Sequence, residues 1–92
     1  MKYLISYDIA DDGLRTQIAK YLEDFASRLQ YSVFVCDMER ERADAVWKQL
    51  LKMSANDAER GLVLMTPLCK TCVKGMKIKG NLLESEEKFL VV

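Results

Sequence analysis

The sequence contains no histidine, a single proline and only four glycines among its 92 residues. Without an imidazole, the chain has no Ser–His or Cys–His nucleophilic pair and no histidine general base. The isolated glycines form neither a phosphate-binding loop nor a dinucleotide fingerprint. Hydrolysis of a phosphodiester would therefore depend on a bound metal ion that polarises the phosphate and activates water.

An excess of one charge and long apolar runs are also missing. Fourteen basic residues balance fourteen acidic residues, so the chain has no overall basic footprint of the kind that nucleic-acid-binding proteins usually carry. There is no apolar run of 18 residues and no N-terminal export pattern. We therefore expect a soluble, cytoplasmic protein with no membrane partner.

Three cysteines are an odd number, and without an export pattern we expect reduced thiols. Cys69 and Cys72 have the C-x-x-C spacing of half a zinc site, but one chain has neither an imidazole nor enough thiols for tetrahedral coordination. Two copies across a dimer axis would supply four thiols. A redox pair is another alternative, and thiols without a ligand are the simplest interpretation.

Hydrophobic periodicity predicts an alternation of strands and helices along the chain. The predicted segments are a strand over residues 1–9, a helix over 13–26, a β-prone run over 29–38, a helix over 39–55 that buries Leu50 and Leu51, a buried strand over 61–66 closed by Pro67, an exposed ribbon over 73–79 and a β-prone tail over 84–92.

This order predicts an α+β fold, a ferredoxin-like βαββαβ sandwich, provided that residues 29–38 supply two strands. No Gly, Pro or Asn marks a turn there, so a bend, a bulge or a differently made hairpin would have to divide the run. We expect one domain over residues 1–92, with 84–92 as an extra C-terminal strand that docks on a partner. A domain of this size buries a limited core, which favours a homodimer.

Asp8 is the main functional candidate because it ends the apolar first strand. Period-two alternation places Leu4, Ser6 and Asp8 on one face and the neighbouring tyrosines and isoleucines on the other. Burying an unpaired carboxylate costs several kcal/mol, so Asp8 should lie at a rim, pair with a cation or bind a metal. If the next β-prone run pairs alongside, Ser32 and Phe34 share the face of Asp8.

Two further acids follow Asp8 closely. Together with Asp11 and Asp12 it resembles a hard-cation site for Mg²⁺, which takes one or two carboxylates together with water and phosphate oxygens. The competing interpretation, which we favour, is that Asp11 and Asp12 cap the following helix.

Basic residues supply candidate phosphate contacts. Arg15 or Arg28 would neutralise phosphate charge, although a surface ion pair is the commoner role for an arginine. Between Gly61 and Leu83 the chain has four lysines and no acid; these are Lys70, Lys74, Lys77 and Lys79. The lysine segment is either a nucleic-acid stripe or the protection of an edge strand against aggregation.

Three motifs together resemble the CRISPR-associated Cas2 family. They are the strand end Tyr7-Asp8-Ile9, Arg15 early in the next helix, and the segment Arg28-Leu29-Gln30-Tyr31-Ser32-Val33-Phe34. Residues 67–72 also look like the family's segment after its fourth strand. The resemblance covers nearly the whole chain, and the order and spacing of the motifs make it specific.

The resemblance implies a homodimer in which the C-terminal strand crosses to the partner's sheet. Asp8 from each protomer would face its twin across the dimer axis and bind a divalent cation, usually Mg²⁺. Arg15 and Arg28 match positions linked to phosphate contact, and Ser32 and Phe34 match residues that line the cleft. The implied activity is metal-dependent endonuclease cleavage of single-stranded RNA or duplex DNA.

The resemblance also implies a second role, as the central dimer that bridges the CRISPR integrase and holds duplex DNA during spacer acquisition. Two departures from the family bear on cleavage. Gln17 stands where many relatives have a second basic residue. After the segment Ser32-Val33-Phe34, Cys36-Asp37 replaces the small or acidic residue with glycine that is commoner in the family. A purely architectural adaptor and a toxin-type ribonuclease of related fold are the alternatives.

Overall fold

A computed structural model of the chain describes residues 1–55, 57, 61–77 and 79. The elements in chain order are β1 (Lys2–Asp8), α1 (Asp12–Glu23), β2 (Ser27–Gln30), β3 (Val33–Asp37), α2 (Arg40–Ser54), β4 (Leu62–Leu68) and α3 (Lys70–Lys74). All neighbouring strands pair antiparallel, in the order β2-β3-β1-β4. The predicted α+β, ferredoxin-like βαββαβ sandwich is confirmed.

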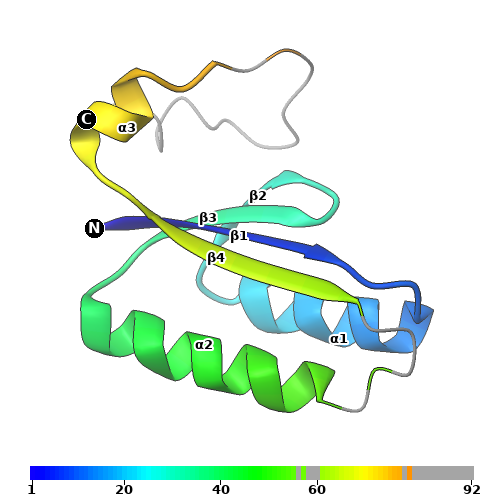
Figure 1. Cartoon of the computed structure of the whole chain (residues 1–92). Helices are drawn as coiled ribbons and strands as arrows, with labels where there is room; N and C mark the ends of the chain where they lie inside the picture. The colour runs from blue at the N-terminus through cyan, green and yellow to red at the C-terminus, as the bar shows by residue number, and fades with distance from the viewer. Residues whose placement is uncertain (56, 58–60, 78, 80–92) are drawn as a thin grey trace.

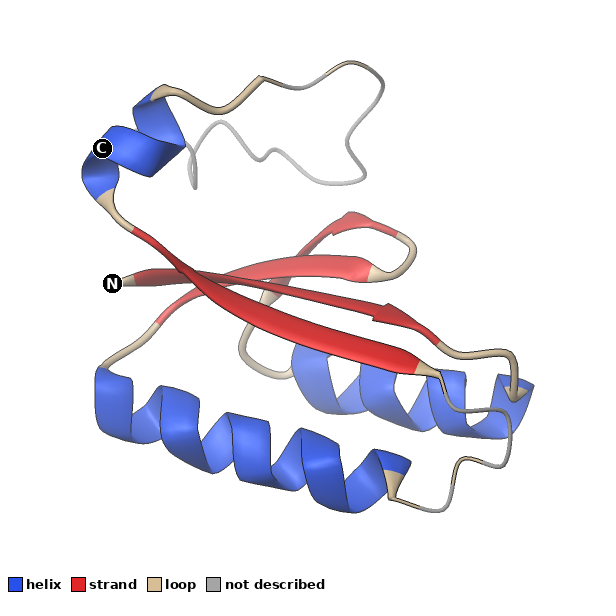
Figure 2. Cartoon of the chain, viewed as in Figure 1, coloured by secondary structure: helices blue, strands red, loops and turns tan. Residues whose placement is uncertain are grey.

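Helices α1 and α2 cover one face of this sheet, whereas the short α3 lies on the other side, beyond the end of β4 (Figures 1 and 2). Within the described part of the chain, no helix is both long and apolar enough to cross a membrane. The sheet therefore has one face covered by two long helices and one face that they leave open.

The core lies between the sheet and these two helices. The apolar face of the first strand is buried as its alternation predicts, and it meets α1 and α2 through side chains at helical spacing. The central residues of this cluster are Ile5, Tyr7, Ile18, Leu22, Phe34, Val46 and Leu50. Burying one such side chain fully contributes about 1.5–3 kcal/mol. Leu51, however, is 49% exposed, so its predicted burial is wrong, whereas the adjacent Leu50 is buried as predicted.

The β-prone run does supply two strands; a turn divides it, and a bulge-like irregularity lies within the first of them. Tyr31 and Ser32 form the turn between β2 and β3, and the pairing register shifts between Arg28 and Gln30. Strand β1 holds the turn, because the Tyr7 N–H donates to the Ser32 carbonyl at 3.1 Å. Tertiary hydrogen bonding thus fixes a turn that has no glycine, proline or asparagine.

Among the described residues β4 is an edge strand, so the prediction of a buried strand that stops before Pro67 is wrong. Pro67 lies within β4, opposite Tyr3 in the register, and an edge strand tolerates a residue that lacks an N–H. Val63 and Met65 pack against the core, whereas Leu62 and Leu64 are 57% and 43% exposed. Alternation along β4 therefore leaves an apolar pair on the open face of the sheet.

The predicted ribbon over residues 73–79 is wrong, because its first residues are helical and residues 75–77 and 79 lie in no strand. Residues 70–74 form α3, with Cys69 as the N-cap and Val73 as the buried residue. One apolar residue among lysines fits a helical turn as well as a strand. Here the helical turn forms, and it buries Val73. The predicted tail over residues 84–92 and its extra strand lie outside the described residues.

Candidate nucleic-acid interface

Asp8 lies exposed at the end of β1, as its position in the strand predicts. It faces Leu62 of β4 in the register and belongs to the open face of the sheet, because its neighbour Tyr7 points into the core. Within the described residues no salt bridge joins a cation to Asp8. The carboxylate therefore remains available to an external ligand.

The two following acids are used by α1. The Asp11 side chain accepts the Gly13 N–H at 3.1 Å and caps the helix, and Asp12 pairs with Arg15. This confirms the capping interpretation for Asp11 and gives Asp12 a structural partner. The three acids do not form a cation site together.

The donor set around Asp8 limits what one chain can bind. In the parts of the chain that the structure describes, no group of three His, Cys, Asp or Glu side chains is placed to hold a metal ion. Mg²⁺ commonly takes only one or two protein carboxylates and completes its octahedron with water and phosphate oxygens. A single exposed carboxylate fits such an ion only when a second copy of Asp8, or a bound phosphate, supplies further oxygens.

A separate polar cleft of about 420 Å³ lies between α1 and the β2–β3 turn. It brings together three of the predicted site residues, Arg15, Arg28 and Ser32. The other residues that line it are Tyr7, Thr16, Ala19, Lys20, Glu23 and Tyr31. Sequence reasoning missed Lys20 and Glu23, although the helical spacing from Arg15 through Ala19 to Glu23 marks one face of α1.

The cleft carries more positive than negative charge. Arg15, Lys20 and Arg28 line it with one acid, Glu23, which pairs with the Arg28 guanidinium at 2.8 Å. Arg15 is paired with Asp12, which does not line the cleft. Arg15 Nη1 also donates to the Ile9 carbonyl at 3.0 Å, so the loop after β1 orients this side chain. A net positive cleft with oriented guanidinium groups is suited to phosphate oxygens.

Arg28 retains an unused donor. Its guanidinium lies 5.1 Å from the centre of the Phe34 ring, and its buried Nε has no hydrogen-bond partner in the described part of the chain. An unsatisfied buried donor costs about 1–3 kcal/mol, and an acceptor that entered the cleft would remove this penalty.

Tyr7 contributes a hydrogen-bonding phenol to the same cleft. Its hydroxyl donates to the Tyr31 carbonyl at 3.3 Å, and its ring stacks with Phe34 at a centroid distance of 6.2 Å. Burial raises the pKa of Tyr7 above its usual value, while the Arg28 charge opposes this shift. Tyr7 is therefore a neutral donor near pH 7 and does not serve as a general base.

The prediction that Phe34 and Ser32 share the face of Asp8 is wrong. Phe34 pairs with Ile5 in the register and is fully buried, so it lies on the helix-covered face, and Val33 takes the place beside Ser6. Ser32 belongs to the turn and lines the cleft. A one-residue change of register exchanges the two faces of a strand, and the turn sets that register here.

The first two lysines of the lysine segment, Lys70 and Lys74, lie at the other end of the sheet. Asp8 faces Leu62 at the start of β4, whereas Lys74 lies in α3, which follows the end of that strand. Seven strand residues span about 23 Å. Lys74, Lys77 and Lys79 are all exposed, and none of them lines the arginine cleft.

Comparisons with known proteins agree with this arrangement of elements. The family described as CRISPR associated protein Cas2 matches residues 1–76. A protein of Chloroflexus aurantiacus named CRISPR-associated endoribonuclease Cas2 1 is 40% identical over 81 residues, which cover 88% of this chain and 86% of that protein. A protein of the same name from Archaeoglobus fulgidus is 37% identical over 73 residues, covering 78% and 76%.

Two solved structures share the fold. The crystal structure of Streptococcus pyogenes Cas2 superposes with a TM-score of 0.72 at 21% identity, covering 87% of this chain and all of that chain (100%). A hypothetical protein from Thermus thermophilus gives a TM-score of 0.71 at 23% identity, covering 88% and 92%.

Proposed function

The chain belongs to the CRISPR-associated Cas2 family, and from this premise we propose that it is a homodimeric, metal-dependent endonuclease of CRISPR adaptation. The observation that carries the proposal is Asp8, an exposed strand-end carboxylate with no cationic partner in the described residues. The names of its relatives, which are called endoribonucleases, support RNA as a substrate. Duplex DNA is the second substrate that we propose.

Asp8 and its twin in a second copy hold a Mg²⁺ ion in this proposal. When bound, such an ion polarises a phosphate and lowers the pKa of a coordinated water. The chain itself supplies the ligand oxygens and, from Arg15 and Arg28, charge that holds a neighbouring stretch of phosphate backbone. The cleft and Asp8 belong to different faces of the sheet, so the arginines position the strand and do not contact the scissile group.

The edge strand supports a dimer that brings two Asp8 side chains together. Leu62 lies directly opposite Asp8, and Leu64 lies opposite Ser6, so the exposed apolar pair borders the carboxylate. Apolar residues on an unpaired strand edge favour pairing with another chain. We propose that a second copy covers β4, with residues 84–92 as the segment that crosses to the partner's sheet.

A nuclease assay with matched carboxylate variants tests the enzymatic proposal. Single-stranded RNA and duplex DNA are incubated with Mg²⁺ or with EDTA, using the natural chain, Asp8→Asn and Asp44→Asn. We expect EDTA and Asp8→Asn each to lower the rate about 100-fold or more, because both remove the metal-held water. Asp44 is exposed on α2, so its variant should cleave normally. Equal cleavage by Asp8→Asn would refute the assignment.

A second function, architectural holding of duplex DNA and the CRISPR integrase, is favoured by the separation of the cationic cleft from Asp8. In that case DNA binding depends on Arg15 and Arg28, and Asp8 is dispensable. Spacer acquisition in cells that carry Asp8→Asn or Arg28→Gln separates the two functions. Survival of acquisition with Asp8→Asn and its loss with Arg28→Gln would assign the biological role to architecture.

A further inference from the structure

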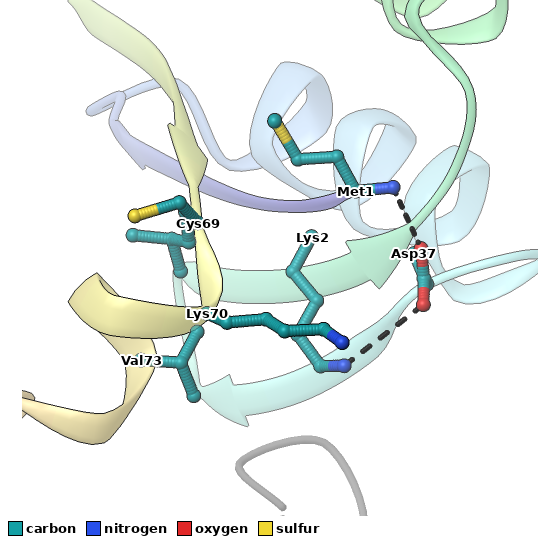
Figure 3. Close-up of a pocket in the computed structure, with 7 residues that line it drawn as sticks. Met1, Lys2, Asp37, Cys69, Lys70 and Val73 are labelled. Carbon is teal, nitrogen blue, oxygen red and sulfur yellow. Dashed lines mark hydrogen bonds and ion pairs between the residues drawn. The ribbon is translucent and has the colours of Figure 1, made fainter. Parts of the chain in front are cut away.

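Two thiols meet at the start of α3, outside both candidate surfaces. Cys69 and Cys72 are exposed, and their Sγ atoms lie 3.2 Å apart. The Cys72 N–H also points at Cys69 Sγ, with an N···S distance of 3.4 Å. Figure 3 shows Cys69 where β4 runs into α3, with its sulfur directed away from Asp37.

The missing further ligands among the described residues, and not the separation of the two sulfurs, set this pair apart from a zinc site. Sulfurs that bind one tetrahedral zinc at about 2.3 Å lie about 3.7 Å apart. A disulfide needs about 2.05 Å, so an approach of about 1.2 Å closes this pair. No third Cys, His, Asp or Glu joins the pair as a potential metal ligand among the described residues.

We infer that Cys69 and Cys72 form a thiol–disulfide exchange site that closes reversibly to a disulfide on reaction with a small-molecule disulfide such as glutathione disulfide. Cys69 attacks one glutathione sulfur as the thiolate, which forms a mixed disulfide and releases one glutathione thiolate. Cys72 then loses its proton and attacks Cys69 Sγ, which releases the second glutathione. Two thiols lose two electrons and two protons, and glutathione disulfide is reduced to two glutathione molecules.

The hydrogen bonds around the pair assign the two roles. The backbone N–H of Cys72 donates to Cys69 Sγ, and the two thiols share a hydrogen bond; both contacts lower the pKa of the Cys69 thiol below its usual value. The same thiol hydrogen bond raises the pKa of Cys72. Cys69 is therefore the better nucleophile near neutral pH, and Cys72 is the resolving thiol.

Closure would constrain the first turn of α3. Cys69, Lys70 and Val73 line a cavity of about 350 Å³ together with Met1 and Lys2 at the start of β1 (Figure 3). A bond between residues 69 and 72 requires their sulfurs to approach and then holds the turn that contains Lys70, which lines this cavity. Oxidation should therefore shift Lys70, the first lysine of the lysine segment.

Titration in glutathione redox buffers with intact-mass readout tests this inference. We expect the natural chain and Cys36→Ser to convert to a species about 2 Da lighter, reversed by excess reduced glutathione. Cys36 is buried in β3 and serves as the matched control. Cys69→Ser should remain folded because serine is a good N-cap, and it should form no lighter species.

The single variants also separate the roles of the two sulfurs. Cys72→Ser should accumulate the glutathione adduct on Cys69 about tenfold faster than Cys69→Ser accumulates it on Cys72. Equal rates for the two variants would overturn the assigned order of attack. Disulfides formed only between chains, or zinc bound by the thiols of the purified protein, would overturn the exchange site itself.

Discussion

The Phe34 ring is fully buried in the core, although the family resemblance places this residue in a cleft. A substitution at Phe34 should therefore lower the stability of the fold. The ring stacks with Tyr7 and supports the Arg28 guanidinium from below. We expect Phe34→Ala to lower the free energy of unfolding by about 3–5 kcal/mol, because it leaves a cavity between sheet and helices. Urea denaturation followed by circular dichroism measures this loss.

Tyr31→Ala is the control, because Tyr31 is 76% exposed in the adjacent turn. Its backbone carbonyl still accepts the Tyr7 hydroxyl, so its free energy of unfolding should change by less than about 0.5 kcal/mol. A Phe34→Ala protein as stable as Tyr31→Ala would contradict the burial of the ring.

Cys36 makes stability depend on pH in the alkaline range. Burial raises the pKa of its thiol from 9.0 to about 11, so the folded state favours the neutral thiol. Stability from this group is complete below pH 9.0 and is lost as the pH rises toward 11. We expect the stability advantage over Cys36→Ala to shrink by about 1 kcal/mol between about pH 8 and about pH 10.

Chemical denaturation of both proteins in a non-thiol reductant measures this difference. The raised pKa of Tyr7 is common to both proteins and cancels in the comparison, whereas the Cys36 charge contributes to the raised pKa of Tyr21 and is lost in the variant. A constant difference across this range would show that the thiol is not desolvated.

At the scale of elements, Gly61 directly precedes β4 and packs against the end of β1, where Asp8 lies. A Cβ there would lie 2.5 Å from Asp57 Oδ2 and 2.8 Å from the Asp8 carbonyl oxygen. We expect Gly61→Ala to cost about 1–3 kcal/mol of stability, because the backbone of Asp8 cannot yield without distorting the β1–β4 ladder. The midpoint temperature of thermal unfolding and the rate of Mg²⁺-dependent cleavage should both fall.

Gly13→Ala is the matched control for that substitution. The added Cβ would lie 3.6 Å from Asp11 Oδ1, an ordinary contact, at the start of α1. Alanine in a helix is about 0.5–1 kcal/mol more favourable than glycine, so this variant should be as stable as the natural chain or more stable. Equal losses in both variants would contradict the tight packing of Gly61.

Local sequence patterns correctly predicted the strands and helices that bury one apolar face. The alternation of β1 placed Tyr7 in the core and Asp8 at the rim, and helical spacing identified both long helices within a few residues of their observed ends. The β2–β3 turn and α3 required tertiary information, because a hydrogen bond from β1 fixes the first and the burial of Val73 fixes the second.

At the scale of the whole molecule, the candidate site was only partly predictable for the same reason. Asp8 follows from alternation within one strand, whereas the cleft joins a helix face to a turn whose register the sequence does not display. Phe34 was therefore assigned to the wrong face, although Arg15, Arg28 and Ser32 do meet. The family resemblance suggested the candidate residues, and the sheet register decides which of them lie together.

Assembly through β4 gives the last prediction. Leu64 is 43% exposed on the open face of the sheet, so Leu64→Lys should leave the fold of one chain unchanged. In a dimer that buries this edge, a desolvated lysine should weaken association tenfold or more, a change of about 1.4 kcal/mol or above. Sedimentation velocity over a range of protein concentrations measures this shift.

Leu51→Lys provides the control, because Leu51 is 49% exposed on α2, on the helix-covered side of the sheet. If two copies of Asp8 share one ion, Mg²⁺-dependent cleavage by Leu64→Lys should fall with the dimer fraction and recover at higher protein concentration by mass action. Leu51→Lys should resemble the natural chain in both assays. Full cleavage by a monomeric Leu64→Lys protein would show that one Asp8 suffices, and the shared-ion arrangement would then be wrong.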